Sequence, residues 1–205
     1  GYQNRNLGSL SLVGTYSKND YDAPPSGVPV VSNSVAQSGI GVTYARKIGN
    51  RLNGSAGVNY NWIDPDGLTD SASAFGANVD LNYRASPRLN LSLDYTLSNN
   101  ASTAADAAYV RTGAFRFAGD YRLNTRVTLN AAVAKTRNDY RGSQTLLPLL
   151  QIRKSDDWII SAGGRVKIGR KVSLTFDASH IDRKADLSQF NYKSDRVSVG
   201  ITGTF

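Results

Sequence analysis

The residues best suited to catalysis gather around the chain's single histidine, His180, in the stretch DASHIDR. Asp182 follows two residues later, and a carboxylate beside a histidine can prepare the imidazole to act as a general base. Ser179 would supply a nucleophile, but consecutive residues of a strand point to opposite faces. The alternation through Phe176 and Ala178 places His180 on their apolar face. We therefore expect no catalytic residues and keep a hydrolase around His180 as the alternative interpretation.

A second chemically interesting group consists of charged side chains within long alternating segments. Six fall on the polar face of their segments: Asp80, Asp94, Arg116, Asp120, Arg165 and Asp177. When each hairpin is folded about its turn, Asp80, Asp94 and Arg116 lie at similar heights on three consecutive strands. Because an unpaired charge is costly to bury, we expect an ion-pair cluster there. The sequence leaves two roles open for it, a charged constriction that selects solutes or a structural plug.

The remaining charges divide between the two ends of these segments. Ten cations cluster at short turns without aspartate: Arg46, Lys47, Arg51, Arg84, Arg88, Arg122, Arg126, Lys167, Arg170 and Lys171. Such cations can snorkel to lipid headgroups, and they form a ring rather than the basic groove of a nucleic-acid-binding protein. Most aspartates lie in or beside long polar connections, where residues 64–70 (DPDGLTD) have an incomplete calcium-loop spacing. We expect neither a metal nor a cofactor.

Ten alternating segments must position all of these charges. The predicted strands cover residues 7–18, 35–47, 51–62, 73–84, 88–98, 109–122, 126–138, 157–168, 171–182 and 194–205. In residues 88–98, for example, leucine or tyrosine alternates with asparagine, serine, aspartate or threonine, which is the two-residue period of a strand. Short basic turns recur at one end, and longer connections rich in Asp, Ser, Asn, Gly and Pro join the other. An even number of strands with this arrangement is typical of a transmembrane β-barrel.

Composition agrees with an all-β membrane protein. The 205 residues include no Cys, Met or Glu, and the abundance of Asp, Asn, Ser and Gly favours turns over helices. No apolar run is long enough for a transmembrane helix, and the first residues do not form a leader, so we expect any signal peptide to have been removed. A β-propeller would need four shorter strands per repeat, and a soluble barrel would not need strands that reach the lipid-spanning length of about 9–11 residues. The prediction is a single domain over residues 1–205, a ten-stranded antiparallel up-and-down transmembrane β-barrel.

Aromatic residues concentrate near the two ends of the predicted strands. One predicted girdle contains Tyr44, Tyr83, Tyr121 and Phe205, and the other contains Tyr16, Tyr60, Trp62, Phe75, Tyr109 and Trp158. Two such girdles are expected where amphipathic rings lie at both water–lipid boundaries. In the last strand, Val197, Val199, Ile201 and Phe205 share one face. This strand must pair with the first one, because an open edge in hydrocarbon leaves backbone groups unsatisfied.

The segments FAGDYRLNTRVTLNAAVAKTRNDY and VDLNYRASPRLNLSLDYTLSNN resemble the hairpins of the putative beta-barrel porin families, found beside exopolysaccharide export systems and as sheaths of multihaem cytochromes. The final strand also resembles the C-terminal insertion signal of bacterial outer-membrane barrels. These resemblances imply an outer-membrane location with periplasmic termini and short turns and with extracellular long loops. They imply a narrow porin-like channel or a scaffold that presents its loops. The implied partners are outer-membrane lipid, lipopolysaccharide, the barrel-assembly machinery and an envelope or export complex, and nucleic acid is not among them.

One enzyme family remains as the alternative by resemblance. The outer-membrane omptin proteases also have ten strands and use aspartates with a histidine at the extracellular rim. Their Asp-x-His order is reversed here, where His180 precedes Asp182. The resemblance therefore implies no catalytic role for either residue.

Overall fold

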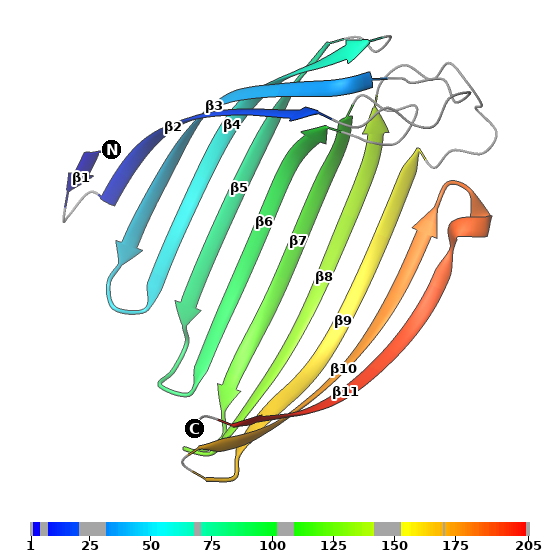
Figure 1. Ribbon diagram of the computed structural model, residues 1–205. Helices are drawn as coiled ribbons and strands as arrows, with labels where there is room; N and C mark the ends of the chain where they lie inside the picture. The colour runs from blue at the N-terminus through cyan, green and yellow to red at the C-terminus, as the bar shows by residue number, and fades with distance from the viewer. Residues whose placement is uncertain are drawn as a thin grey trace.

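A computed structural model describes residues 2–4, 8–20, 32–67, 71–101, 109–141, 153–169 and 171–203. The strands form one antiparallel sheet in which each strand pairs with its neighbours in the chain (Figure 1). The elements are β1 (Tyr2–Asn4), β2 (Gly8–Asp20), β3 (Ser32–Ile48), β4 (Leu52–Gly67), β5 (Ala72–Arg84), β6 (Leu89–Ala101), β7 (Tyr109–Arg122), β8 (Val127–Arg141), β9 (Lys154–Lys167), β10 (Val172–Ala185), the 3-10 helix η1 (Ser188–Phe190) and β11 (Tyr192–Gly203). Within these ranges, no helix is both long and apolar enough to cross a membrane.

The ten predicted strands correspond to β2–β11, and their ends differ mainly beside the long connections. Asp64 and Asp139, which the sequence analysis assigned to connections, belong to the ladders of β4 and β8. Asp64 pairs with Ala36 and Asp139 with Lys154. Turn-forming composition misled the prediction there, because the hydrogen bonds of a ladder continue for as long as a neighbouring strand is present, whichever side chains it carries. The short strand β1 was not predicted.

The short turns are fixed by local polar contacts. The Oδ1 atom of Asn124 accepts hydrogen bonds from the backbone N–H groups of Arg126 and Val127, both at 2.8 Å. Ser86 has the same role in the preceding short turn, where its Oγ accepts from Leu89 N at 3.0 Å. Gly49 has a φ of 61°, a conformation that glycine adopts without steric cost. These turns set the register of the long hairpins.

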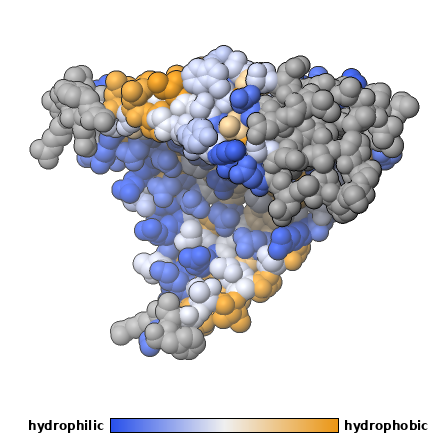
Figure 2. Space-filling view, turned by 45° about the horizontal axis from the view of Figure 1, so that its top comes forward, coloured by the Kyte–Doolittle hydropathy of each residue, from blue (hydrophilic) through white to orange (hydrophobic). Residues whose placement is uncertain are grey.

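Burial in this sheet is inverted relative to a soluble protein. Among the described residues, the buried hydrophobic side chains are Val35, Ile63 and Ala118, whereas large apolar side chains are exposed along nearly every strand. With few exceptions, such as Val13, the exposed ones share the face that alternates with the charged positions. Figure 2 shows a hollow lined largely by hydrophilic residues, with hydrophobic residues on the outer margins. The concave face is therefore the polar one, as predicted, and the convex face is suited to lipid.

The two outer strands have free edges in the part of the chain that the structure describes. β11 pairs with β10 alone, and β2 pairs with β3 and, through Gly8–Leu10, with β1. Val199 on β11 is 70% exposed, compared with 40% for Val42 inside the sheet, because among the described strands β11 has a neighbour on one side only. Figure 1 shows the two edges apart. The predicted pairing of the last strand with the first is thus not confirmed, and β1 occupies part of the edge that it would need.

Candidate functional site

The concave wall is the candidate functional surface, and glycines keep it shallow. A Cβ atom on Gly57 would clash with Oδ1 of Asn78, and one on Gly39 would clash with Oδ1 of Asn61. In both cases the amide of one strand lies flat over a glycine of the next strand. A wall built in this way presents hydrogen-bonding groups to the concave side without projecting far into it. The same arrangement recurs where Asp177 lies over Gly163.

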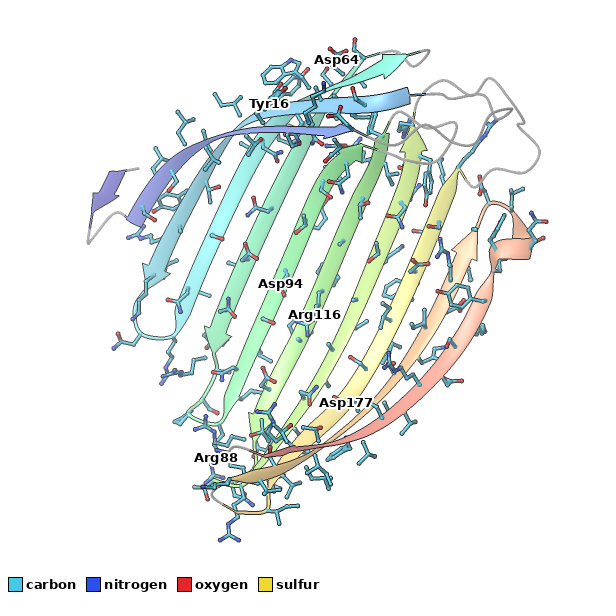
Figure 3. All side chains as sticks on the ribbon, in the orientation of Figure 1. Tyr16, Asp64, Arg88, Asp94, Arg116 and Asp177 are labelled. Atoms are coloured by element: carbon cyan, nitrogen blue, oxygen red, sulfur yellow. The ribbon has the colours of Figure 1, made fainter. Side chains whose placement is uncertain are left out.

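Three of the predicted charges meet halfway along the strands. Asp80 pairs with Asp94 across β5 and β6, and Asp94 pairs with Arg116 across β6 and β7. Nη1 of Arg116 lies 3.8 Å from Oδ2 of Asp94, and Ser55 donates a hydrogen bond of 2.9 Å to Asp80. Figure 3 shows Asp94 and Arg116 on neighbouring strands at similar height. In the open sheet the side chains of Arg116 and Asp94 keep 54% and 39% of their exposure.

The other three predicted charges form a separate group nearer the short turns. Asp120, Arg165 and Asp177 line a depression of about 750 Å³ together with Arg122 and Lys167. Asp120 and Asp177 lie in one row across four strands. Asp120 on β7 is opposite Asn130 on β8, which is opposite Gly163 on β9, which is opposite Asp177 on β10. All six charges were expected on one inward, polar face, and the cross-strand register separates them into two levels of the wall.

A third polar group on the concave wall escaped the sequence analysis. Nε of Arg183 lies 3.5 Å from Oδ1 of Asp157, and both side chains are mostly buried. Arg183 also approaches Ser155, to which Asn138 donates a hydrogen bond of 3.3 Å. Because residues 183–193 and 139–156 were expected to form connections, Arg183 could not be aligned with Asp157 or Ser155 from the sequence. The available signal was the two-residue alternation of β10, which continues through Arg183.

The long-connection end of the wall is partly filled. Nε2 of Gln37 on β3 donates a hydrogen bond of 3.1 Å to the backbone oxygen of Asn99 on β6. Ile63 and Val35 are 0% and 2% exposed, and Asn99 is 2% exposed. The hydrogen bond ties two strands that are separated by two others, so the sheet curls strongly here. The wall therefore narrows toward this end.

The residues around His180 do not assemble a catalytic site in the described part of the chain. Nδ1 of His180 lies 2.7 Å from Oδ1 of Asp195, a residue that the sequence analysis did not pair with it. Asp182 instead lies 3.8 Å from Lys193. Both pairs are on the convex face, whereas Ser179 alternates to the concave face. A histidine–carboxylate pair is present, but the nucleophile that a hydrolase would need is on the other side of the sheet.

Aromatic side chains occupy convex positions toward both ends of the strands. The members of the predicted girdles for which the structure gives exposed rings are Tyr16, Tyr44, Tyr60, Trp62, Phe75, Tyr83, Tyr121 and Trp158. The rings of Tyr60 and Trp62 meet edge to face at 4.9 Å, and Lys135 lies 5.2 Å from the ring centre of Trp158. Val197, Val199 and Ile201 are also convex and exposed, while Phe205 lies outside the described residues.

An antiparallel meander with a polar concave face and an apolar, aromatic-rimmed convex face defines the wall of an outer-membrane β-barrel. The chain belongs to the family described as "Putative beta-barrel porin 2", which matches residues 13–205. Among curated proteins, no sequence match is found.

Two solved structures of an iron transporter share the fold. The chain is similar to the FrpB iron transporter from Neisseria meningitidis, with a TM-score of 0.60 and 11% identity for the F3-3 variant. It is also similar to the apoprotein form of the F5-1 variant, with a TM-score of 0.55 and 10% identity. Both alignments cover 74% of this chain and 26% of the transporter, so the chain spans about a quarter of that protein. The NanC porin aligns over 97% of both chains with 13% identity and a TM-score of 0.46.

Proposed function

We propose that the chain forms the wall of a narrow, water-filled outer-membrane pore that admits small polar solutes. The observation that carries this proposal is the charge on the concave wall, which remains exposed to water around Asp94 and Arg116. By alternation, the inward positions of the described strands carry eight cations and five aspartates, an excess of three positive charges: Lys47, Arg84, Arg116, Arg122, Arg165, Lys167, Arg183 and Arg196 against Asp80, Asp94, Asp120, Asp157 and Asp177. A solute moving along this wall would meet hydrogen-bonding groups throughout.

Both free edges must be hydrogen-bonded when the sheet lies in a membrane, because unsatisfied backbone groups are costly in hydrocarbon. The ten-stranded barrel expected from the sequence would join β11 directly to β2, and these two strands have the opposite directions that antiparallel pairing requires. Further strands between the two edges would give a wider barrel. The partial coverage of FrpB and the position of β1 on the edge of β2 agree with the wider arrangement.

The proposed orientation places the short turns in the periplasm and the long connections outside the cell. Lys135 lies opposite Trp158 on the convex face, and Arg137 and Asp156 follow at the long-connection end, where Lys135 lies 3.7 Å from Asp156. Charged groups at this level suit contacts with lipopolysaccharide phosphates. Contacts with the assembly machinery or with an export complex stay predictions from the sequence. No described contact favours the scaffold or the enzyme over the pore.

Single-channel recording in planar bilayers tests the pore. Discrete conductance steps are expected, and a folded protein that inserts without conducting would contradict the proposal.

Introduced pairs of cysteines test whether β11 joins β2 directly, because the chain contains no other Cys. Ser198→Cys on β11 is combined in turn with Ser11→Cys, Val13→Cys and Thr15→Cys on β2. An intrachain disulfide would show direct closure, since it needs Cα atoms about 4.4–6.8 Å apart. Its absence from the conducting protein would exclude direct closure in the registers that these pairs probe.

Hydrogen exchange tests the edges independently of conductance. The backbone amides of β11 should be protected in lipid as strongly as those of β7, which has a partner on each side. Rapid exchange of β11 in a folded, membrane-inserted protein would contradict the proposal that its edge is hydrogen-bonded.

A further inference from the structure

Each strand from β3 to β10 has a cation within or immediately before its short-turn end. The eight cations are Lys47, Arg51, Arg84, Arg88, Arg122, Arg126, Lys167 and Lys171. In each short hairpin, the two cations are four residues apart, at the end of one strand and just before the next. By the alternation of their strands, all eight are at concave positions, whereas Arg46 alternates to the convex face. Arg88 is labelled at this end in Figure 3.

Backbone pairing brings cations of successive hairpins together. Arg84 N donates to Arg51 O and Arg122 N donates to Arg88 O, both at 2.7 Å. Lys167 N donates to Arg126 O at 2.8 Å. Neighbouring strands are about 4.8 Å apart, so like charges lie side by side along the rim. The eight residues therefore form one continuous arc, which we call the cationic arc.

Six members of the cationic arc, those in the three backbone-paired positions, form no ion pair with an aspartate among the described residues, and all six are exposed. Asp120 and Asp177 line the same depression as Arg122 and Lys167, but among the described residues neither aspartate forms an ion pair with these two cations. Like charges opposite one another destabilise a sheet. The arrangement therefore costs stability unless an external anion neutralises it.

We propose that the cationic arc binds multivalent phosphate or carboxylate anions at the short-turn mouth and makes the pore anion-selective. Arginine guanidinium groups bind these oxyanions with charge-assisted, often bidentate hydrogen bonds. A ring of such groups sets the charge preference of a pore. The occupant is an anion that enters the concave side, because the side chains share the face of Asp94 and Asp177. The selectivity part rests on the proposed pore, whereas anion binding does not require conduction.

Tripolyphosphate is a suitable probe for the cationic arc. Its affinity for the folded protein in neutral detergent is measured by titration calorimetry for the wild type and for the triple variant Arg84→Gln/Arg122→Gln/Lys167→Gln. The matched control, Arg46→Gln/Arg111→Gln/Lys135→Gln, removes the same charge from convex positions. We expect at least tenfold weaker binding for the triple variant and less than a twofold change for the control. Binding should also weaken as salt screens the charges.

Equal weakening in both variants, or no binding to the wild type, would overturn the proposal. Lipid phosphate is the other source of this chemistry, and vesicles distinguish it. If anionic vesicles stabilise the wild type more than the triple variant while the affinity for tripolyphosphate is unchanged, the arc binds headgroups and the proposal is wrong. In planar bilayers of zwitterionic lipid, a chloride preference should fall in the triple variant. Absence of any conductance refutes the pore, whereas conductance without this preference refutes selection by the arc.

Discussion

Leu93→Arg on β6 tests the assignment of the convex face to lipid. Leu93 lies on the convex face opposite Leu81 on β5 and Phe117 on β7. It is the midpoint of the outward positions from Leu89 to Leu97, which are separated by about eight steps of about 3.4 Å, or about 27 Å along the strand. A strand tilt of about 40° reduces this to about 21 Å across the bilayer, close to the usual apolar band of about 25 Å. Leu93 therefore lies near the middle of the hydrocarbon.

An arginine at the bilayer midplane of a barrel costs about 2–4 kcal/mol. For Leu93→Arg, this corresponds to a roughly 30- to 1,000-fold smaller folding equilibrium constant. Ser92→Arg is the matched variant, because Ser92 alternates to the concave face and pairs with Asn82 and Ala118. There the guanidinium stays in water, and the expected cost is under about 1 kcal/mol. Leu93→Ala measures what is lost by removing the leucine itself.

Urea-dependent unfolding in lipid vesicles gives the free energies, with the fluorescence of Trp62 and Trp158 as the signal. The reasoning requires Leu93→Arg to be at least about 2 kcal/mol less stable than Ser92→Arg. Equal destabilisation by the two arginines would refute the assignment of the faces. A greater loss for Ser92→Arg would show that the concave side is the dry one.

Three further variants address packing, selectivity and the histidine. Gly164→Ala should lower the free energy of unfolding by about 1–3 kcal/mol, because the new Cβ would lie 2.6 Å from a ring carbon of Phe176 on β10. Gly14→Ala is the control and should be neutral, since its Cβ would meet nothing within 4 Å. Equal unfolding midpoints for the two variants would contradict this packing. Arg116→Gln should shift the reversal potential toward cations, and because its side chain is 54% exposed it should change stability by less than about 1 kcal/mol; an unchanged potential would remove Arg116 from the pore. His180→Ala, which loses the contact with Asp195, should leave conductance unchanged; loss of a hydrolytic activity would restore the enzyme interpretation.

Sequence alone was sufficient for the repeated elements and their two faces. The alternation of Leu89, Leu91 and Leu93 with Asn90 and Ser92 depends only on the two-residue period of a strand, so it could be followed without any tertiary contact. Short turns such as the one at Ser86 are likewise local, since one side chain and the next few backbone groups define them. For this reason the ten long strands and the polar character of the concave face were predictable.

The alignment between strands is where the sequence became insufficient. The pairing of Asp94 with Arg116 was predicted, because the position of each residue could be counted from the short turn of its own hairpin. The pairing of Arg183 with Asp157 was missed, because turn-like composition concealed where their strands end. The sequence showed that ten basic residues gather at the short turns. Which of them lie on the concave face and which on the convex face was not predicted, although the alternation of the strands contains this information.

The sequence by itself determined which residues alternate, where the chain reverses and how charge is distributed along the strands, because these properties depend on a few consecutive residues. Only the tertiary structure decided which strands carry their charges side by side and how strongly Gln37 and Asn99 curl the wall. It also decided that, within the described ranges, β11 pairs only with β10 and the outer edge of β2 pairs only with β1. Those features arise from hydrogen bonds between residues far apart in the chain, and their geometry depends on register and curvature, which accumulate from strand to strand across the sheet.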